Sequence, residues 1–561
     1  MAVRGPDSDC AAGWDAVAAR IAASGARAVA VDAYPGVRAA DLAELLARLQ
    51  PELHLDTAEA LRPPAEVERL VRPHLTDDPV FGRLNGLELA DFFDPAALAA
   101  LRHRAEAASG RVVVTGPGAT LVLGGGLLVY ADLPRWEAQL RQRAGESGSL
   151  AAQDAGAHPL ELYKRGFFVD WRVADRHKLR LWDRVDLFLD TVRQDEPKLV
   201  SRQALDVALR AVARQPFRVV PYFDPAPWGG EWMRRVCDLE GSAPNYGWCF
   251  DCVPEENSLL LGFGRHEVEV PALNLVLREP SALLGEAVHE RFGAEFPIRF
   301  DFLDTMGGGN LSLQVHPRTE YIREHFGVAY TQDESYYLLD AEPGAAVYLG
   351  LREDADPRAF ESDLRRAAEG GTSFPADAYV NRWPARRHDH FLIPAGTVHC
   401  SGAGSMVLEI SATPYIFTFK LWDWDRLGLD GRPRPLHLDH GLANVAWDRR
   451  TEFARRELVN RVTPVDEGEG WREERTGLHE LEFIETRRHW FEVPVTHPGG
   501  TVHVLNLVEG AEAVVESPEG GFEPFTVHYA ETFIVPAAAG DFRIRPAGPG
   551  VHATIRASVR A

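Results

Sequence analysis

The feature that most constrains the fold is a change in local pattern near Phe217. Before this point, short apolar runs alternate with amphipathic segments, which indicates a parallel α/β sheet covered by helices. After it, glycine, proline and aromatic residues become frequent, and short apolar segments follow one another at close intervals. Many short strands separated by turns are typical of a β-sandwich or barrel. The 561 residues also exceed what one hydrophobic core usually holds, so several domains are predicted.

The first 150 residues are predicted to form an α/β domain. Predicted strands cover residues 28–31, 111–114 and 127–130, and helical patterns cover 15–23 and 39–49. The segment resembles phosphate-binding-loop kinases of the uridine-kinase type in Val31-Asp32, Asp77-Asp-Pro-Val80 and the basic segment around Arg135, Arg141 and Arg143. The loop signature G-x-x-x-x-G-K-[ST] is absent, so the resemblance implies a degenerate, non-catalytic kinase-like domain. Whether this domain binds a nucleotide stays open.

The remaining domain boundaries follow the same changes in pattern. We predict a helical connector, a metal-binding barrel, a helical segment and a second barrel without metal, over residues 151–215, 217–440, 441–485 and 486–561 respectively. Two segments, Phe391-Leu-Ile-Pro-Ala395 and Phe533-Ile-Val-Pro-Ala537, repeat one strand-and-turn pattern. This repeat predicts two jelly-roll barrels in tandem. The fold class is therefore multidomain, α/β followed by mainly β, with intervening helices.

Four polar residues in the first predicted barrel form a candidate metal site. Gln314 and His316 are two residues apart, so in a strand their side chains point to the same face. Glu334 opens another predicted strand, and His399 follows a Pro-Ala-Gly turn. An amide oxygen, a carboxylate and two imidazoles are suitable ligands for a divalent transition metal. Each residue alone has a structural explanation, such as a buried, hydrogen-bonded histidine, and the combination favours a metal.

Residues 217–561 resemble class I mannose-6-phosphate isomerases, which are zinc-dependent double cupins. The resemblance lies in the order and spacing of these motifs: Trp228–Gly230, Phe302–Asp304, Leu311–Pro317, Leu339–Gly344, Ile393–His399, Leu408–Ile410, Trp422–Arg426 and Gly431–His437. It implies that Gln314, His316, Glu334 and His399 bind Zn²⁺. Mn²⁺, Fe²⁺, Co²⁺ and Ni²⁺ suit the same ligands.

The resemblance also implies the reaction and its residues. Aldose–ketose interconversion moves a proton between C1 and C2 through an enediol, with a metal and a positioned base. Glu409 matches an acidic position beside the family's active site, and Ser312 matches a substrate-contacting serine. Arg426 is a candidate for stabilising substrate charge; the alternative is a salt bridge to Asp423 or Asp425. Predicted catalytic residues are Glu409, Lys420 and Arg426.

Three departures from the family pattern fall on the substrate side of the site. Asp301 and Gln332 stand where the family usually has lysine, and Lys420 aligns with an arginine. Lysine and arginine are not equivalent in bidentate contacts with phosphate. The departures leave the metal ligands intact but leave the exact sugar open. Arg382, Arg386 or Arg387 could supply a phosphate contact instead.

These observations favour a metal-dependent isomerase of a hexose phosphate, mannose 6-phosphate to fructose 6-phosphate or a close relative. One alternative is a non-catalytic sugar-phosphate-binding or regulatory protein of the same fold. Another is an isomerase of a different or unphosphorylated sugar. A two-activity enzyme, with a kinase in the N-terminal domain, is disfavoured by the missing phosphate-binding loop.

Charge and cysteine content narrow the partners and the compartment. The formal charge of −23 disfavours nucleic acid, because an acidic surface repels phosphate backbones. Five cysteines suggest no disulfide framework, and the N-terminus lacks the apolar core of a signal peptide. No run of about 18 apolar residues is present, so no membrane partner is expected. We predict a cytoplasmic protein whose partner is a small sugar phosphate, with the oligomeric state open.

Overall fold

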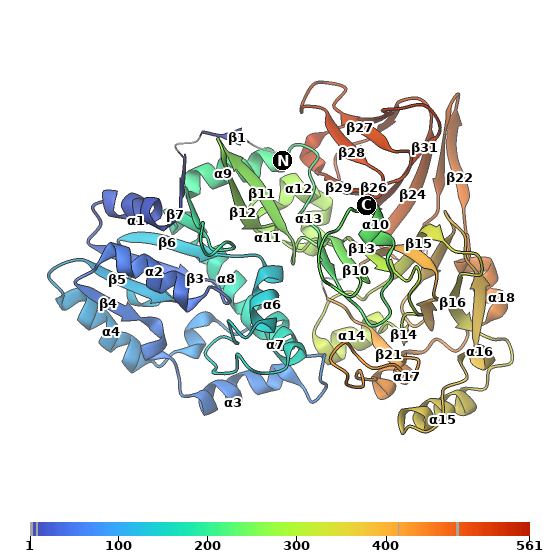
Figure 1. The fold of residues 1–561 in the computed structure, drawn as a ribbon, viewed down its shortest axis with the longest axis horizontal. Helices are drawn as coiled ribbons and strands as arrows, with labels where there is room; N and C mark the ends of the chain where they lie inside the picture. Colours follow the sequence, from blue (N-terminus) through green and yellow to red (C-terminus); the bar gives the residue numbers. More distant parts are fainter. Residues whose placement is uncertain (1–3, 7–8, 413–414, 478–481, 561) are drawn as a thin grey trace. The chain divides into compact units, whose positions relative to one another are not determined.

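The structure is a computed structural model that describes residues 4–6, 9–412, 415–477 and 482–560 (Figure 1). Small parts of the predicted ranges 1–150, 217–440, 441–485 and 486–561 therefore lie outside the described residues. The chain forms two compact units. The first comprises residues 1–212 and 254–279, and the second comprises 213–253 and 280–561. No helix in the described part of the chain is long and apolar enough to cross a membrane.

A seven-stranded sheet forms the centre of the first unit, in the order β2-β8-β7-β6-β3-β5-β4. Its middle strands are β3 (Ala28–Ala33), β5 (Val112–Gly116) and β6 (Leu127–Asp132), with parallel pairing between β3 and its two neighbours. Their apolar residues are almost fully buried, as expected for a parallel sheet covered on both faces. Helices α1 (Trp14–Ala23) and α2 (Ala39–Leu49) match the predicted helical segments. The predicted α/β class of this region is confirmed.

Helix α4 (Pro95–Ala107) shows how local sequence signals set an element boundary. Asp94 is its N-cap and accepts a hydrogen bond from the Ala97 amide at 2.8 Å, and Pro95 occupies the first turn. Asp94→Ala is expected to lower the free energy of unfolding by about 1 kcal/mol, because a first-turn amide loses its acceptor. Chemical denaturation measures this change. The exposed Glu106→Ala in the same helix is the control and should change the unfolding free energy less.

The first barrel of the second unit consists of two antiparallel sheets. One has the order β18-β15-β20-β13-β10-β9 and the other the order β17-β16-β19-β14-β21. The bounds of the strands that matter for the site are β13 Arg299–Asp304, β14 Leu313–Val315, β15 Glu334–Ala341, β18 His390–Ile393, β19 His399–Ser401, β20 Ser405–Ser411 and β21 Phe419–Trp422. Nearly every residue of these strands is buried, so their polar side chains depend on hydrogen-bond partners within the protein.

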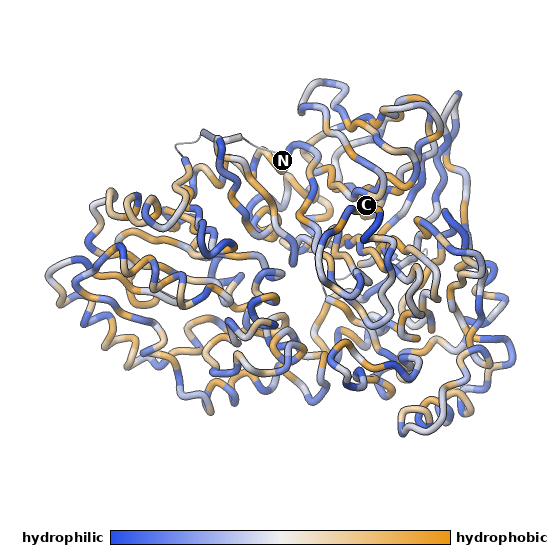
Figure 2. Tube along the Cα trace, viewed as in Figure 1, coloured by the Kyte–Doolittle hydropathy of each residue, from blue (hydrophilic) through white to orange (hydrophobic). Residues whose placement is uncertain are grey.

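The second barrel has the same two-sheet construction. Its sheets run β22-β23-β24-β31-β26-β29 and β25-β30-β27-β28. Both sheets contribute to one apolar core, which includes Leu505, Phe533 and Phe542. Figure 2 shows that hydrophobic residues follow the strands while many connecting loops are hydrophilic. Each of the two regions predicted to be a barrel therefore contains a pair of antiparallel sheets.

Three predicted segments differ from the structure. The helical connector, residues 151–215, contains α8 (Trp171–Leu181) and α9 (Arg202–Val212) but also β7 (Leu187–Asp190) and β8 (Lys198–Ser201), which belong to the central sheet. The helical segment 441–485 contains β22 (Thr463–Gly468) and β23 (Trp471–Arg475). Residues 254–279, predicted in the metal-binding barrel, cluster with the first unit. Four-residue strands carry too little periodicity to be separated from helical neighbours, and β23 is mostly charged.

Candidate metal centre

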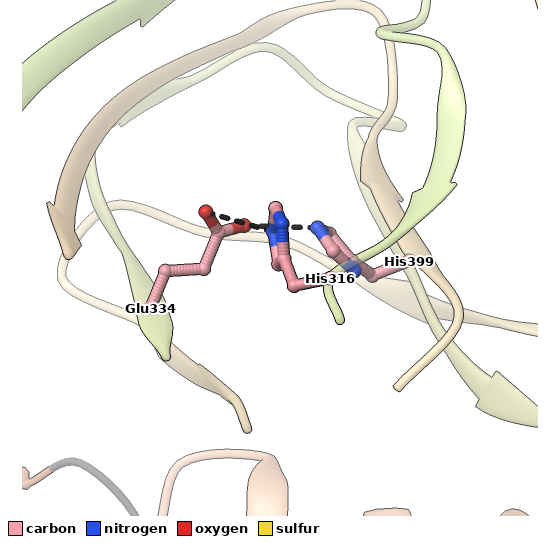
Figure 3. A group of neighbouring side chains, drawn as sticks. All are labelled: His316, Glu334 and His399. Carbon is pink, nitrogen blue, oxygen red and sulfur yellow. Dashed lines mark ion pairs between the residues drawn. The ribbon is translucent and has the colours of Figure 1, made fainter. Parts of the chain in front are cut away.

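Strand pairing brings the four predicted ligands to one end of the first barrel. Gln314 on β14 lies directly opposite His399 on β19, so both side chains face the same side of their sheet. His316 follows β14 by one residue and continues this face. Glu334, the first residue of β15, projects from the other sheet. Figure 3 shows the side chains of His316, Glu334 and His399 converging.

The distances between these side chains are short. Glu334 Oε2 lies 3.0 Å from His316 Nε2, and Glu334 Oε1 lies 2.9 Å from His399 Nε2. The Gln314 amide nitrogen lies 3.2 Å from His399 Nε2, so the end of this side chain also reaches the group. His316, Glu334 and His399 are completely buried. Among the described residues they are the one group of three histidine, cysteine or acidic side chains whose donor atoms all lie within 4.8 Å.

The outer nitrogens of the two imidazoles show that the group suits a cation. His316 Nδ1 lies 2.8 Å from the Phe417 carbonyl oxygen, and His399 Nδ1 lies 2.8 Å from the Thr397 carbonyl oxygen. A carbonyl only accepts, so each Nδ1 carries a hydrogen, and each ring in its neutral form presents the Nε2 lone pair to Glu334. Lone pairs facing a carboxylate repel unless a positive charge lies between them. This arrangement, with the outer nitrogen fixed by the backbone, is typical of metal-binding histidines.

Electrostatics in the group follow the same contacts. Burial by itself lowers the pKa of His316, but the adjacent Glu334 carboxylate raises it above the usual value. At His399 burial prevails and the pKa is lowered. Burial favours the neutral form of Glu334, yet the charge of His316 holds the pKa of this carboxyl far below its usual range. Glu334 therefore stays ionised and supplies the negative charge that a divalent cation requires.

Gln332 connects two of the ligands. Its amide nitrogen donates to Glu334 Oε2 at 3.0 Å, and its amide oxygen accepts from the Phe417 backbone amide at 2.8 Å. The carbonyl of the same residue, Phe417, holds His316 Nδ1. The Gln332 side chain thus orients the Glu334 carboxylate directly. It orients the His316 imidazole indirectly, through the backbone of Phe417. At this position, where the resembled family usually has lysine, the chain carries a support for the metal ligands.

Arg449 supports the turn that carries His399. Its Nη1 atom is the donor in all three contacts, and it lies 2.5–2.7 Å from the carbonyl oxygens of Pro394 and Ala395 and from the Thr397 hydroxyl. The Thr397 carbonyl in turn holds His399 Nδ1. Burial lowers the pKa of Arg449, and the nearby charge of Asp333 partly offsets this effect. The guanidinium fixes the Pro-Ala-Gly-Thr turn and, through it, the orientation of one imidazole.

Arg449→Lys is expected to weaken metal binding by up to about tenfold, the lower end of the range for outer-shell partners. All three acceptors surround the single Nη1 atom, and the shorter lysine side chain keeps the charge but does not place its nitrogen at the same point. Competition with a chromogenic chelator measures the affinity. The exposed Arg358→Lys is the matched control, since Arg358 contributes only a backbone contact to a helix N-terminus. Equal metal affinities in the two variants would contradict the supporting role of Arg449.

Acidic groups line the wall beside Glu334. Glu409 on β20 lies opposite both Tyr336 and Asp301 in the sheet. Burial, and then the charges of Glu334 and Asp301, raise the pKa of Glu409 well above its usual value. Burial raises the pKa of Asp301 to about 6, although Arg299 opposes this effect. Burial therefore favours the protonated form of Glu409, beside the metal-ligand group.

Lys420 and Ser312 lie on or next to the strand that carries Gln314. Lys420 on β21 is opposite Gln314 in the register, so the row His399, Gln314 and Lys420 crosses three strands on one face. Lys420 is partly exposed, whereas Ser312 is buried two residues before Gln314. The sheet therefore places one lysine on the same face as two of the ligands.

The structure holds Arg426 away from this group. Its guanidinium donates to the Asn310 carbonyl oxygen and to the Asp423 carboxylate, both at 2.6 Å. Asn310 lies in the loop before β14, whereas His316 follows the other end of this strand. The salt bridge to Asp423, the alternative interpretation of Arg426, is present. Arg382, another suggested phosphate contact, lies on the edge strand β17 (Val380–Pro384) and is exposed.

Sequence reasoning missed Arg299 and Arg449. Arg299 is buried two residues before Asp301 on the same face of β13, and its guanidinium lies 3.3 Å from the Asp301 carboxylate. The i, i+2 spacing of opposite charges in a buried strand is a signal that could have identified this pair. Arg449 is 50 residues after His399 in the chain, and no local pattern connects the two.

The two antiparallel barrels and the buried His-Glu-His group define a cupin-like fold with a candidate metal centre. A solved structure, the mannose 6-phosphate isomerase from Bacillus subtilis, is similar with a TM-score of 0.50 and 18% identity. The match covers 61% of this chain and 99% of that structure. This similarity concerns the fold.

Relatives in sequence carry the same name. The chain is 27% identical to the mannose-6-phosphate isomerase of Streptococcus mutans over 217 residues, which is 38% of this chain and 63% of that protein. It is 31% identical to the mannose-6-phosphate isomerase of Bacillus subtilis over 150 residues, 27% of this chain and 44% of that protein. The chain thus spans less than two thirds of each relative. Residues 13–214 match a family described as a domain of unknown function (DUF8485), so the kinase-like interpretation is not confirmed.

Proposed function

We propose that the protein is a metal-dependent aldose–ketose isomerase of a hexose phosphate, interconverting mannose 6-phosphate and fructose 6-phosphate or a close relative. The observation that carries this proposal is the buried group in which both Nε2 atoms face Glu334 while both Nδ1 atoms are bonded to backbone carbonyls. The names of the relatives support the choice of reaction. Gln314, His316, Glu334 and His399 would hold the metal, with Zn²⁺ as the expected ion.

The surrounding residues have distinct proposed roles. A divalent metal at this site supplies Lewis-acid stabilisation of the negative charge that develops on the sugar oxygens. Glu409, whose protonated form is favoured by burial, would hold a proton near the reacting carbons. Lys420 would face the negative charge of the substrate, and Ser312 would contact the sugar. Arg426 has no substrate role in this proposal, because Asp423 and Asn310 hold its guanidinium.

Metal analysis combined with an isomerase assay tests this function. We expect stoichiometric Zn²⁺ or a related metal, together with conversion of mannose 6-phosphate to fructose 6-phosphate that a chelator abolishes. Metal-loaded protein that converts none of the hexose phosphates would refute the proposed substrate class. Protein that converts them equally well after complete metal removal would refute the role of the metal.

A second candidate substrate is an unphosphorylated sugar. It is favoured by Gln332 and Asp301, which stand at the two positions where the resembled family usually has lysine. Gln332 is hydrogen-bonded to Glu334 and Phe417, and Asp301 adds a carboxyl that Arg299 partly balances. Comparing kcat/KM for mannose and mannose 6-phosphate decides between the two, since phosphate recognition requires a cation such as Lys420. Lys420→Met should reduce kcat/KM for mannose 6-phosphate and leave kcat/KM for mannose unchanged.

For the N-terminal α/β unit we propose a degenerate kinase-like domain without phosphotransfer activity. The absence of the phosphate-binding-loop signature from the sequence supports this proposal. ATP hydrolysis by the full chain, measured with and without hexose, tests it. ATP turnover that requires hexose and persists in a metal-site variant would show that this unit is an active kinase.

A further inference from the structure

The registers of the two barrels match strand for strand. In the first barrel β15 pairs with β18 and β20, and in the second β26 (His503–Glu509) pairs with β29 (Thr532–Val535) and β31 (His552–Val559). Both β18 and β29 run directly into a Pro-Ala turn. The equivalent triplets across the three strands are Ile393, Glu334 and Ser411 in the first barrel and Val535, His503 and Ser558 in the second. His503 therefore occupies the position of the metal ligand Glu334.

The other ligand positions have counterparts too. His497 on β25 (Val495–His497) lies opposite Phe542 on β30 (Phe542–Pro546), as Gln314 lies opposite His399. The ring centroids of His497 and Phe542 are 4.9 Å apart. A phenyl ring cannot bind a metal, so the second barrel lacks one ligand. Its interior is related to the metal centre by position and not by chemistry.

The charges on the neighbouring wall are inverted. In the first barrel the opposed pair on β13 and β20 is Asp301 and Glu409. The opposed pair at the same register in the second barrel, on β24 (Ile484–Phe491) and β31, is Arg487 and Arg556. Even the flanking ion pair is reversed: Arg299 with Asp301 becomes Glu485 with Arg487. A wall that suits a cation in one barrel thus suits an anion in the other.

A carboxylate of the protein already occupies this position. Glu473, on β23, lies 3.1 Å from Arg487, 3.2 Å from Arg556 and 3.0 Å from His489. Burial raises its pKa, but its hydrogen bond to His489 and the nearby cations bring the value down to about 2. Strands β22 and β23 form a hairpin at the edge of the sheet and are mostly exposed. The carboxylate that contacts Arg487, Arg556 and His489 therefore belongs to a hairpin at the protein surface.

Glu473 leaves several inward groups unsatisfied. Five buried atoms here have no hydrogen-bond partner among the described residues: His489 Nδ1, His497 Nε2, His503 Nδ1, Thr554 Oγ1 and Arg556 Nε. All five side chains are more than nine-tenths buried. An unsatisfied buried polar atom is unfavourable, and native proteins normally fill such positions with water or a ligand. The barrel interior therefore contains more hydrogen-bonding groups than the Glu473 carboxylate engages.

We propose that the interior of the second barrel, around Arg487, Arg556 and His489, binds a small oxyanion that takes the place of the Glu473 side chain. The ligand carries a phosphate or a carboxylate group, because both match the oxygen geometry that Glu473 supplies. Binding moves Glu473 out and loosens the β22–β23 hairpin. The site is separate from the metal centre in the first barrel.

Titration of the full chain with inorganic phosphate and, separately, with acetate tests this proposal and separates the two ligand sources. Glu473→Gln removes the competing charge, so it is expected to bind the oxyanion at least about tenfold more tightly than the wild type, by calorimetry. The oxyanion should also raise the Tm of this variant by mass action. Adding Arg556→Gln should abolish the gain. The exposed Glu523→Gln in the same barrel is the charge-matched control and should behave as wild type.

Hydrogen exchange in the wild type gives a readout that does not depend on the variants folding. Saturating oxyanion should accelerate amide exchange in β23, because Glu473 leaves its partners, while exchange around His316 and His399 stays unchanged. Tighter binding in Glu473→Gln together with faster exchange in β23 supports the site. Equal affinity of Glu473→Gln and wild type, or exchange in β23 that does not respond, overturns it.

Discussion

Replacing His399 with alanine is expected to remove the bound metal and to lower isomerase activity by about a thousandfold, since the metal supplies several kcal/mol of transition-state stabilisation. His399 is completely buried, and its Nε2 lies 2.9 Å from Glu334. Alanine removes one of the two imidazoles and leaves the Glu334 carboxylate with His316 alone. Metal content after dialysis and kcat/KM with the converted sugar measure the two effects.

The exposed His103→Ala, on α4 of the first unit, is the control for a general loss of histidine. It should retain both metal and activity. A decrease in activity with full metal content in His399→Ala would mean that His399 acts on the substrate rather than on the metal. Unchanged metal content and activity would show that the buried group is not the active centre.

The sequence was sufficient for elements whose periodicity is long. The helix over Ala39–Leu49 and the strands that begin at Ala28 and Leu127 agree with the pattern within a few residues. It failed where elements are short or charged. Strands β7 and β8 have four residues each, and β22 consists largely of polar residues that a sheet edge tolerates. Their assignment depends on pairing with distant strands, which no local window contains.

The candidate site divides in the same way. The spacing of Gln314 and His316 predicts a shared face because a strand repeats every two residues, and the register confirms that Gln314 lies opposite His399. The contacts that orient the ligands were not predictable. Arg449 acts through backbone carbonyls, and carbonyls leave no signal in the sequence. The inverted wall of the second barrel likewise depends on strand registers, which no local sequence pattern contains.

Gln332→Leu is expected to lower metal affinity by about 10–100-fold, the range found for partners that orient metal ligands. Leucine has nearly the same size, so the change removes two hydrogen bonds without opening a large cavity. Glu334 loses its 3.0 Å donor, and the buried Phe417 amide loses its acceptor, which frees the carbonyl that holds His316. Metal dissociation constants, measured with a fluorescent chelator, report the change.

Gln332→Glu separates the two contacts of this side chain. Its carboxylate still accepts from the Phe417 amide, but it repels Glu334, because two adjacent carboxylates compete for one cation. We therefore expect Gln332→Glu to change metal affinity through its added charge and Gln332→Leu to change it through the lost orientation of the ligands. The exposed Gln203→Leu is the control and should bind metal as tightly as the wild type. If Gln332→Leu binds metal as tightly as wild type but loses kcat/KM, then Gln332 contacts the sugar directly, as the lysine at this position of the resembled family is expected to do.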